Sequence, residues 1–307
     1  MSTRRSFIQH SAALVGGLAI ARNANTFFEV AKTRPAGLQL FTLFTTIDSD
    51  VAGSLKKVAG IGYKEIESAF SKKGGFYGMK ASEFGKLVKD QGMSWKSHHV
   101  LGAPFKMPAD AKPMLDSNGQ PIVFPPIRNL KDNMQELVDE VAAAGVPFMV
   151  CASTPIGTLD EVKASIDVLA KTGEACKKAG IGFAYHNHDK EFVALEGQVP
   201  YDMMLSQLSP DEVKFELDLC WVTKAGVDPV DLFTRHPGRF PLWHVKDLDK
   251  AMTGPQPVGT GIVDFKRIFD NADKAGMKHF FVEHDMPADA FASITTSFQN
   301  LKKMKLV

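Results

Sequence analysis

Two histidines lie one residue apart at the end of an apolar run in the segment FAYHNHDKEF. Alternate side chains of an extended strand point to the same face, so His186 and His188 share one direction. Three later segments, FELDLC, LWHVKD and FFVEHD, place Asp218, His244 and Glu283 at similar strand ends. Two imidazoles and two carboxylates can surround a divalent ion such as Mn²⁺, Zn²⁺ or Co²⁺. We therefore predict one metal site with the ligands His186, Asp218, His244 and Glu283.

Each of these residues also has an ordinary structural role. A single histidine at a strand end is commonly a hydrogen-bonded core residue, and an aspartate before a helix is commonly an N-cap. Burying such groups without an ion leaves charges that cost on the order of several kcal/mol each, unless the groups pair among themselves. A metal site is therefore favoured, and a structural polar cluster is the alternative. Glu216 and Cys220 share the phase of Asp218, and we expect an internal ion pair for the first and buried packing for the second.

The elements that carry these residues alternate short apolar runs with amphipathic stretches, a pattern typical of a parallel sheet wrapped by helices. Eight runs have strand character, which fits a (β/α)8 TIM barrel, whose strand carboxyl ends converge on the active site. A doubly wound open sheet is the alternative, but no GxGxxG motif follows the first run. The predicted strands are residues 38–44, 64–67, 94–100, 148–152, 181–185, 213–219, 240–246 and 279–282.

Helical periodicity between the predicted strands is clearest at residues 130–144, 159–179 and 265–275. These stretches would cover the outside of the barrel. Glycine commonly follows the last residue of a helix, because it adopts the left-handed conformation at little cost. The helix ends expected from this rule are Gly60, Gly145, Gly180 and Gly276.

One connection departs from the short loops of such a barrel. Residues 103–126 hold six prolines, which are too many for a helix, and the segment is too long for a tight turn. It follows the third predicted strand, on the face where barrels build active sites. We interpret it as a lid or substrate-pocket insertion, with a plain surface excursion as the alternative.

The first 21 residues have the composition of a targeting segment. Arg4-Arg5 precede a weakly apolar run that ends in the small-x-small triplet AIA. The segment resembles a twin-arginine export signal. A membrane anchor is the alternative, but the run has about half of the roughly 20 apolar residues that a spanning helix needs. We therefore predict cleavage near Ala21, a linker over residues 22–36, a barrel over residues 37–307 and a periplasmic location.

Charge and cysteine content exclude some classes of protein. The formal net charge is +1, whereas nucleic-acid binders usually show a strongly basic face, so no nucleic-acid partner is expected. Beyond the targeting segment, no stretch is long and apolar enough for stable membrane insertion. Cys151, Cys176 and Cys220 are too widely spaced for a disulfide framework or a CxxC motif, and buried packing is expected for all three.

The motifs GYKEIE, YHNHDKEF, ELDLCWVTKAGVDP, LWHVKDLD, VGTGIVDF and VEHD, in this order, resemble the sugar phosphate isomerase/epimerase-like group of xylose isomerase-type TIM barrels. The resemblance covers residues 37 to about 303 and is most specific after residue 148. It implies one divalent metal, often Mn²⁺, with Zn²⁺, Co²⁺ or Mg²⁺ as alternatives. The implied ligands are again His186, Asp218, His244 and Glu283, but many epimerases have a glutamate where this chain has His186.

The resemblance implies a divalent-metal-dependent sugar isomerase or epimerase that abstracts a proton next to a carbonyl of a carbohydrate substrate. Glu283 is the expected base, and His188 is expected to accept or return a proton on the other side. Lys246 is expected to polarise a substrate oxygen, and a salt bridge of Lys246 to Asp247 or Glu283 is the alternative.

Three further residues are expected to contact the substrate. Glu67 ends the second predicted strand and His99 lies near the end of the third, so both would reach the pocket rim. Trp221 follows Asp218 closely and would lie at the mouth, as a surface on which a sugar stacks or as a helix-packing residue.

The same fold supports several reactions, so it does not select among them. A lyase or hydratase acting on 3-keto-glycosides is one alternative, which suits an exported protein and implies an exported sugar oxidoreductase upstream. A non-catalytic periplasmic sugar-binding barrel is another. Such a protein would have little reason to keep Asp218, His244 and Glu283 together, because their desolvation is costly without a metal.

Overall fold

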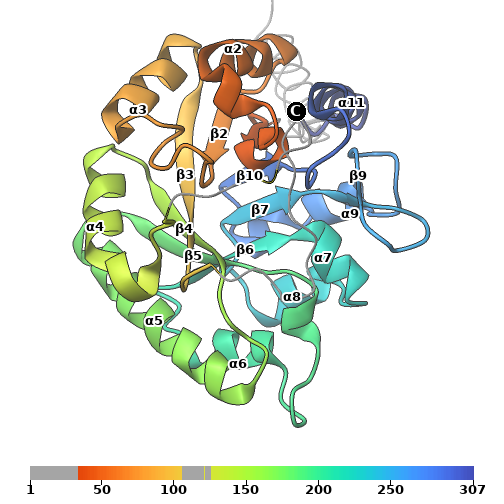
Figure 1. Ribbon diagram of the computed structural model, residues 1–307. Helices are drawn as coiled ribbons and strands as arrows, with labels where there is room; N and C mark the ends of the chain where they lie inside the picture. Colours follow the sequence, from red (N-terminus) through yellow and green to blue (C-terminus); the bar gives the residue numbers. More distant parts are fainter. Residues whose placement is uncertain (1–33, 106–120, 122–125) are drawn as a thin grey trace, which may run out of the picture. The chain divides into compact units, whose positions relative to one another are not determined.

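The computed structural model describes residues 34–105, 121 and 126–307. Its principal strands are β1 (Gly37–Gln39), β2 (Glu65–Ser68), β3 (Ser94–Leu101), β4 (Phe148–Ser153), β5 (Gly182–His186), β6 (Lys214–Asp218), β7 (Leu242–Val245) and β10 (His279–Val282). They are all parallel and close into a barrel in the order β1-β10-β7-β6-β5-β4-β3-β2 (Figure 1). The predicted (β/α)8 barrel is confirmed.

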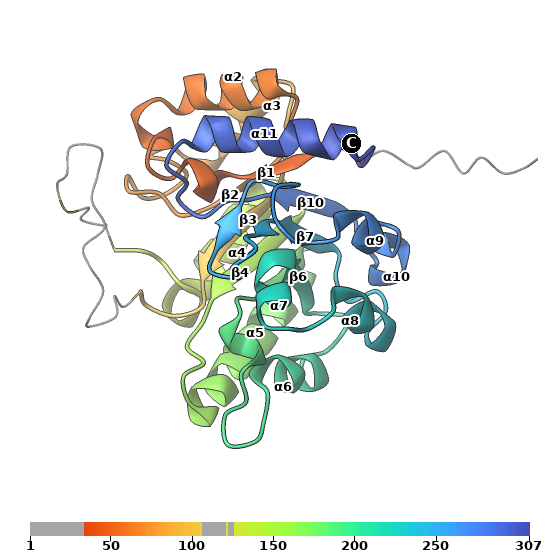
Figure 2. The ribbon, with the colours of Figure 1, turned by 90° about the vertical axis from the view of Figure 1, so that its right-hand side faces the viewer.

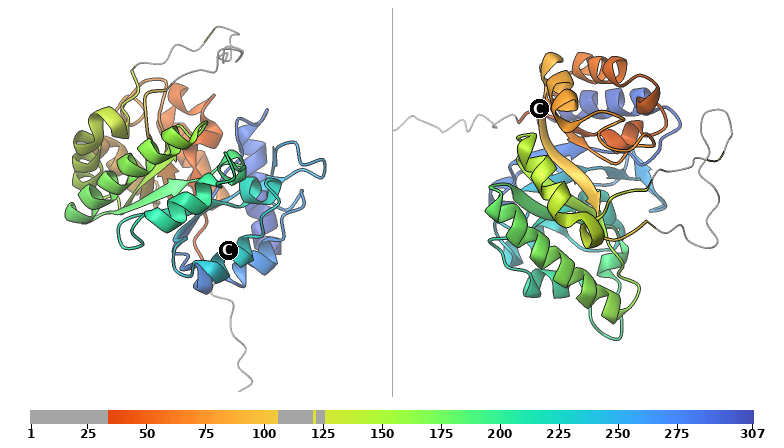
Figure 3. Two further views of the ribbon diagram at one scale, coloured as in Figure 1. Left: turned by 90° about the horizontal axis from the view of Figure 1, so that it is seen from below. Right: turned by 60° about the vertical axis from the view of Figure 1, so that its left-hand side comes forward.

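Helices follow the strands and cover the outside of the barrel (Figure 2). Helices α4 and α5 pack side by side, α4 against β3 and β4 and α5 against β5 (Figure 3). The α-helices are α2 (Val51–Ile61), α3 (Ala81–Asp90), α4 (Leu130–Ala143), α5 (Leu159–Lys178), α6 (Pro200–Gln207), α7 (Leu219–Lys224), α8 (Pro229–Arg235), α9 (Phe265–Phe269), α10 (Ala272–Ala275) and α11 (Ala290–Lys303). Short 3-10 turns are η1 (Leu40–Leu43), η2 (Ile47–Ser49) and η3 (Lys190–Phe192), and β8 (Asp247–Leu248) pairs antiparallel with β9 (Pro255–Gln256).

Two element predictions are wrong in detail. The first strand was expected over residues 38–44 but ends at Gln39, because the Gln39 side chain accepts a hydrogen bond from Phe41 N and starts the 3-10 turn η1. The helix expected over residues 265–275 is divided into α9 and α10, since the backbone leaves the helical conformation at Asn271, which has a φ of −105° and a ψ of 12°.

The end of α2 is also placed differently from the prediction. Gly60 lies inside this helix, and the chain reverses at Gly62, which has a φ of 129°. A Cβ atom on Gly62 would lie 2.3 Å from the Phe298 ring of α11, so this position combines an unusual backbone conformation with a close approach. Gly145, Gly180 and Gly276 follow helices in the left-handed region, as predicted.

Inward-facing side chains form layers along the barrel axis. The floor is a separate apolar cluster of Phe148, Val150, Ala184, Leu242 and Phe281. Two residues further along a strand rise about 6.6 Å, so each strand passes from this floor to a polar layer above it. On β7, for instance, Leu242 belongs to the floor, and the alternation brings the buried His244 and then the buried Lys246 to successive levels. The floor therefore separates the charged interior from the amino end of the barrel.

Several predictions concern parts of the chain outside the described residues. The targeting segment 1–21, most of the linker 22–36, and residues 106–120 and 122–125 of the proline-rich insertion belong to this group. In the part of the chain that the structure describes, no helix combines the length and the apolar character needed to cross a bilayer.

Gly60, inside α2, and Gly62, which follows this helix, give a matched test of this packing. Gly62→Ala is expected to lower the free energy of unfolding by about 1–3 kcal/mol, because alanine is strained at this φ and meets the Phe298 ring. Gly60→Ala is the control, since it has open space around it and lies within a helix; it should be neutral or stabilise the protein by up to about 1 kcal/mol. Urea unfolding followed by circular dichroism measures both values, and equal effects would contradict this account.

Candidate metal and active site

Four buried residues from neighbouring strands meet at the carboxyl end of the barrel. His186 ends β5, Asp218 ends β6, His244 lies on β7 and Glu283 follows β10. One ligand atom of each lies within 4.8 Å of those of the others. His186 Nε2 is 3.4 Å from Asp218 Oδ2, and His244 Nδ1 is 2.8 Å from Glu283 Oε2. The structure thus brings together the four residues predicted as ligands, and we call them the upper cluster.

The two histidine rings are held by their outer nitrogens. His186 Nδ1 lies 3.3 Å from the Ala152 carbonyl oxygen, to which it donates, so Nε2 faces Asp218 without a proton. His244 Nε2 lies 2.7 Å from Glu67 Oε1, to which it donates, so Nδ1 faces Glu283. Outer partners of this kind orient histidines that bind metals. Both rings therefore direct their inner nitrogen, Nε2 of His186 and Nδ1 of His244, into the same small volume.

The inner atoms of the upper cluster lack good hydrogen bonds. Neither His244 Nδ1 nor Glu283 Oε2 has a hydrogen-bond partner of adequate geometry, although both are buried. Burial opposes a charge on His244, but Glu216 and Glu283 raise the pKa of its ring well above the ordinary value, so Nδ1 carries a proton unless a metal ion replaces it. Burial, with the neighbouring His244, lowers the pKa of His186 to about 3, which keeps this ring neutral. These residues fit a divalent ion.

Lys246 Nζ is an internal cation beside the same group. It is fully buried and lies 3.1 Å from Asp218 Oδ2, 2.6 Å from Glu283 Oε2 and 2.8 Å from Asp285 Oδ2. Burial alone would lower the pKa of Lys246, but the three carboxylates, Asp218 first, raise it well above the ordinary value. Of the two salt bridges considered from the sequence, the one to Glu283 is present.

Asp247 points away from Lys246 and fixes the following loop. Its Oδ2 accepts hydrogen bonds from Gly259 N (2.8 Å), Thr260 N (3.1 Å) and Gly261 N (2.8 Å). A Cβ atom on Gly261 would lie 2.0 Å from the Leu248 carbonyl oxygen, so only glycine fits this turn. The VGTGIVDF motif therefore serves to close the loop after β7 around a buried carboxylate.

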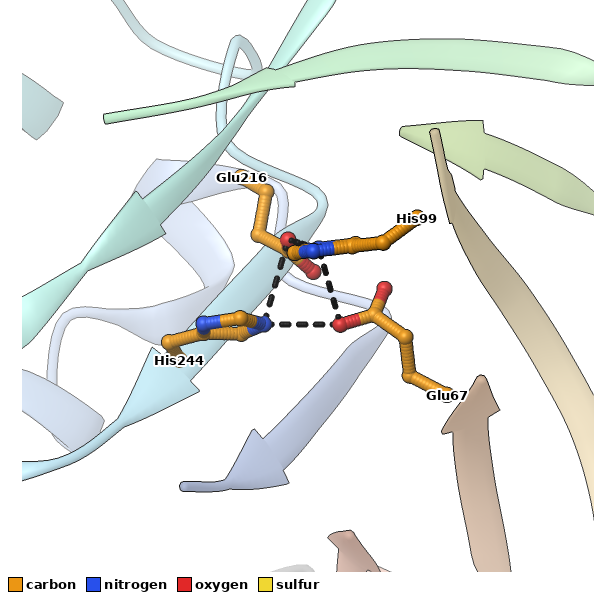
Figure 4. Close-up of side chains that lie close together, drawn as sticks. All are labelled: Glu67, His99, Glu216 and His244. Atoms are coloured by element: carbon orange, nitrogen blue, oxygen red, sulfur yellow. Dashed lines mark hydrogen bonds and ion pairs between the residues drawn. The ribbon is translucent and has the colours of Figure 1, made fainter. Parts of the chain in front are cut away.

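A second charged group lies one level deeper (Figure 4). It consists of Glu67, His99, Glu216 and His244, and we call it the lower cluster. His99 Nε2 is 2.6 Å from Glu216 Oε2 and 3.1 Å from Glu67 Oε1, while His244 Nε2 is 2.7 Å from Glu67 Oε1 and 3.2 Å from Glu216 Oε2. The internal ion pair expected for Glu216 is present. His244 belongs to both clusters, through its two ring nitrogens.

The position of Glu67 and His99 differs from the prediction. They were expected at the pocket rim, but Glu67 is fully buried and His99 nearly so, because Glu67 contacts His244 and His99 contacts Glu216 inside the barrel. Glu67 is already saturated with donors, because Gln39 Nε2 donates to its Oε1 at 2.7 Å and Ser97 Oγ donates to its Oε2. Substrate contact by Glu67 stays a prediction. His99 also lines a side cavity of about 60 Å³, through which a ligand atom would reach it.

The charges of the lower cluster follow from its burial. Burial opposes ionisation of Glu67, but His99 and His244 hold the pKa of its carboxyl well below the ordinary value. For Glu216, burial and the neighbouring Glu67 raise the pKa to about 7. The pKa of His99 rises to about 9, because the two carboxylates outweigh its burial. The residue types could hold a metal, but their mutual hydrogen bonds already occupy every ligand atom except Glu216 Oε1, which is buried without a partner.

His188 lies above the upper cluster at the mouth of the barrel. Its side chain is 42% exposed, and its ring is 4.9 Å from the His186 ring and 6.0 Å from the Trp221 ring. Burial alone would lower its pKa, but the nearby Glu191 raises it above the ordinary value. Glu191 Oε2 accepts a hydrogen bond from His188 N at 3.0 Å. Trp221 lies beside Lys246, whose Nζ is 5.3 Å from the centre of its ring.

Sequence reasoning missed two residues that position others. Buried Glu191 holds the turn of His188 and also accepts a hydrogen bond from the Tyr185 hydroxyl at 2.8 Å. Buried Gln39 orients Glu67 across the first two strands. The signal for Glu191 was its place three residues after His188 in HNHDKEF, and the signal for Gln39 was its inward phase at the end of the first strand.

Cys151, Cys176 and Cys220 are all free and buried. Burial raises the pKa of the Cys151 and Cys176 thiols to about 12. The expected packing role of the cysteines is confirmed.

The charge of Glu67 is expected to affect the affinity for a metal ion that Glu67 does not contact. Glu67→Gln should weaken Mn²⁺ binding by about 10- to 100-fold, because the carboxylate no longer orients His244 through its Nε2–H. Glu65→Gln is the matched control: Glu65 is two residues earlier on β2 and pairs with His279 instead. Competition with a metal-sensitive fluorescent chelator measures both affinities. An equal loss in the two variants would mean that the effect is not specific to His244.

Comparison with known proteins gives the family of the chain. A family model described as Xylose isomerase-like TIM barrel matches residues 55–304. A solved sugar phosphate isomerase/epimerase from Parabacteroides distasonis ATCC 8503 superposes with a TM-score of 0.71 at 27% identity, over 88% of this chain and 98% of that chain. The IOLI protein, solved with a zinc atom, superposes with a TM-score of 0.64 at 13% identity, over 89% of this chain and 98% of that chain, which is a likeness of fold alone.

Among curated proteins, the inosose dehydratase of Geobacillus thermodenitrificans (strain NG80-2) is 25% identical over 145 residues. These residues are 42% of this chain and 48% of the relative, so the match spans about half the length of that protein. Isomerase/epimerase and dehydratase names thus both occur among the proteins that this chain resembles. Because the family model covers most of the sequence, the chain belongs to the xylose isomerase-like TIM barrel family.

Proposed function

We propose that the protein is a divalent-metal-dependent sugar isomerase or epimerase that removes a proton next to a carbonyl of a sugar or sugar derivative. The observation that carries this proposal is the upper cluster, in which two oriented imidazoles and two carboxylates direct their ligand atoms into one buried volume. Relatives named as an isomerase/epimerase and as a dehydratase support the same class of chemistry.

The metal would be held by His186, Asp218, His244 and Glu283. When bound, such an ion acts as a Lewis acid on a carbonyl oxygen and acidifies the neighbouring C–H group. Mn²⁺ is proposed first, with Zn²⁺, Co²⁺ or Mg²⁺ as alternatives, because mixed imidazole and carboxylate ligands suit all of these ions to differing degrees.

Glu283 and His188 are the proposed acid–base pair. Burial opposes ionisation of Glu283, but Lys246 and His244 hold the pKa of its carboxyl below the ordinary value, so it is ionised, as a group must be before it accepts a proton. His188 lies at the half-open mouth, where Glu191 fixes its turn and the ring reaches a substrate from the solvent side. Lys246 would neutralise negative charge that develops on the substrate oxygen.

A lyase or hydratase acting on 3-keto-glycosides is the second candidate, and His186 favours it. Many epimerases of this group have a glutamate at the position of His186, so the chain lacks a pair of glutamates that remove and return a proton symmetrically. One carboxylate base and one partly exposed histidine acid suit elimination, in which Glu283 removes a proton and His188 protonates the leaving oxygen. A non-catalytic sugar-binding barrel is the remaining alternative, and purified protein without bound metal would favour it.

The proposed partner is a small carbohydrate, which Trp221 would contact at the mouth. Export to the periplasm and cleavage near Ala21 are also proposed, on the basis of Arg4-Arg5 and the short apolar run after them. A substrate of the 3-keto type would come from an exported sugar oxidoreductase.

The proposed acid–base role of His188 can be tested by substitution. His188→Ala should keep metal affinity within about twofold and lower turnover by roughly 10²- to 10⁴-fold, since it removes an acid–base group and no ligand. His236→Ala is the control, because this histidine ends α8 away from the strand ends that carry the site. The assay is a screen of free sugars, glycosides and their 3-keto forms, with each variant loaded with Mn²⁺.

Isotope exchange gives an independent measurement of proton transfer. In heavy water the parent protein should introduce deuterium at the carbon next to the substrate carbonyl, because the proton passes through groups that exchange with solvent. Mass spectrometry of the product detects this label. Full activity of His188→Ala together with an unlabelled product would instead support a hydride shift between carbon atoms.

The export proposal is tested by replacing Arg4 and Arg5 with lysine. The double variant is expected to stay in the cytoplasm as the full-length precursor, because the twin-arginine pair is read by the export machinery. Cell fractionation followed by mass spectrometry of the N-terminus measures location and processing. Mature protein in the periplasm of the lysine variant would contradict the assignment.

A further inference from the structure

The ammonium group of Lys246 occupies contacts that a metal ion in the upper cluster would need. Lys246 Nζ lies 3.1 Å from Asp218 Oδ2 and 2.6 Å from Glu283 Oε2. These are the same two oxygens that face His186 Nε2 and His244 Nδ1. Lys246 is fully buried and contacts both carboxylates directly.

A third carboxylate, that of Asp285, is an ion-pair partner of Lys246 outside the upper cluster. Asp285 Oδ2 lies 2.8 Å from Nζ, and its side chain is 31% exposed, whereas Asp218 and Glu283 are buried. Asp285 contributes no atom to the group of four candidate ligands. The Trp221 ring, 5.3 Å from Nζ, lies on another side of the ammonium. A small movement of Nζ toward Asp285 would therefore break its contacts with the two candidate ligands and keep one strong ion pair.

From this geometry we infer that Lys246 is a built-in competitor of the metal ion, and that Asp285 is the alternative partner that releases it. Without an ion, Lys246 neutralises Asp218 and Glu283 and keeps the upper cluster assembled. With an ion bound to those oxygens, Lys246 pairs with Asp285. The inference rests on the proposed metal function and adds that this lysine–aspartate pair sets the metal affinity.

Electrostatics gives the reason for the competition. An ion within ligand distance of Asp218 Oδ2 and Glu283 Oε2 would lie within a few ångströms of an ammonium on the same oxygens. Two positive charges at such a separation repel each other strongly when water is excluded. The repulsion lowers the affinity for the ion unless Nζ withdraws, and the carboxylate of Asp285 makes withdrawal favourable. Lys246 therefore lowers metal affinity, while Asp285 restores part of it.

Opposite effects of two substitutions test the inference. Lys246→Met keeps most of the length of the side chain and removes its charge, so Mn²⁺ should bind at least tenfold more tightly. Asp285→Asn removes the alternative partner, so Mn²⁺ should bind about tenfold more weakly. Both are measured on the full-length protein, stripped of metal, by competition with a fluorescent chelator at constant pH and ionic strength. Unchanged or weaker binding by Lys246→Met would overturn the inference.

The double variant separates this mechanism from a general effect of charge. If Asp285 acts through Lys246, then Asp285→Asn should change Mn²⁺ affinity by less than twofold in the Lys246→Met background. If the aspartate acts only by its own negative charge, the loss will be the same in both backgrounds, and the pairing is wrong.

Thermal unfolding gives a second measurement and also shows whether the Lys246→Met variant folds. Metal-free Lys246→Met should have a lower melting temperature than the metal-free parent, and saturating Mn²⁺ should remove most of this difference. If Lys246→Met does not fold, Asp285→Asn still decides, because unchanged affinity in that variant contradicts the inference. A parent protein that binds no divalent ion overturns the proposed function itself, whereas a parent that binds Mn²⁺ with the same affinity as both variants overturns only this inference.

Discussion

The shared ring of His244 joins the two charged clusters inside the barrel. Its Nε2 is held by Glu67 in the lower cluster, and its Nδ1 faces Glu283 in the upper cluster. Without an ion, the surrounding carboxylates raise the pKa of this ring and Nδ1 carries a proton. A ring that binds an ion would be neutral, so its one proton, fixed at Nε2, would leave the lone pair of Nδ1 for the ion. The lower cluster therefore determines what the upper cluster can bind. Gln39 and Ser97 matter for the same reason, since they hold the Glu67 carboxylate in place.

The apolar floor, the lower cluster and the upper cluster lie at successive levels along the barrel axis, and this order limits the free-energy cost of burying their charges. The apolar floor below the lower cluster keeps water out, which strengthens the ion pairs above it and also makes any unpaired charge costly. The lower cluster balances its two carboxylates with two imidazoles. In the upper cluster, His244 Nδ1 and Glu283 Oε2 face each other at 2.8 Å without good hydrogen bonds, whereas in the lower cluster only Glu216 Oε1 lacks a partner. The upper cluster therefore has more atoms left to bind an ion.

Histidine at position 186 changes the charge of the ligand set. A glutamate there would give three carboxylates, whereas this chain has two, Asp218 and Glu283, with Lys246 beside both. Loss of one negative charge lowers the attraction for a divalent ion, and an internal cation lowers it further. Family membership thus describes the frame of the site, while the charge of the site is particular to this sequence.

The sequence by itself determined which residues share a direction. Strand alternation has a period of two, so the phase of His186, Asp218, His244 and Glu283 followed from the local pattern, and neighbouring parallel strands placed their ends at one edge. Only the tertiary structure determined how deeply Glu67 and His99 are buried. It also determined that Lys246 pairs with Glu283 and not with Asp247.

These remaining features depend on contacts between distant parts of the chain. Glu67 and His244 are 177 residues apart and lie on strands β2 and β7, which are not neighbours in the barrel. Their meeting depends on how closure staggers the strands, and a local sequence pattern contains no measure of that stagger. Asp247 instead accepts hydrogen bonds from backbone amides of a loop more than ten residues later. The periodicity of the sequence does not predict this contact either. The local sequence therefore determined the direction of each side chain, and barrel closure determined its depth in the barrel and its partner.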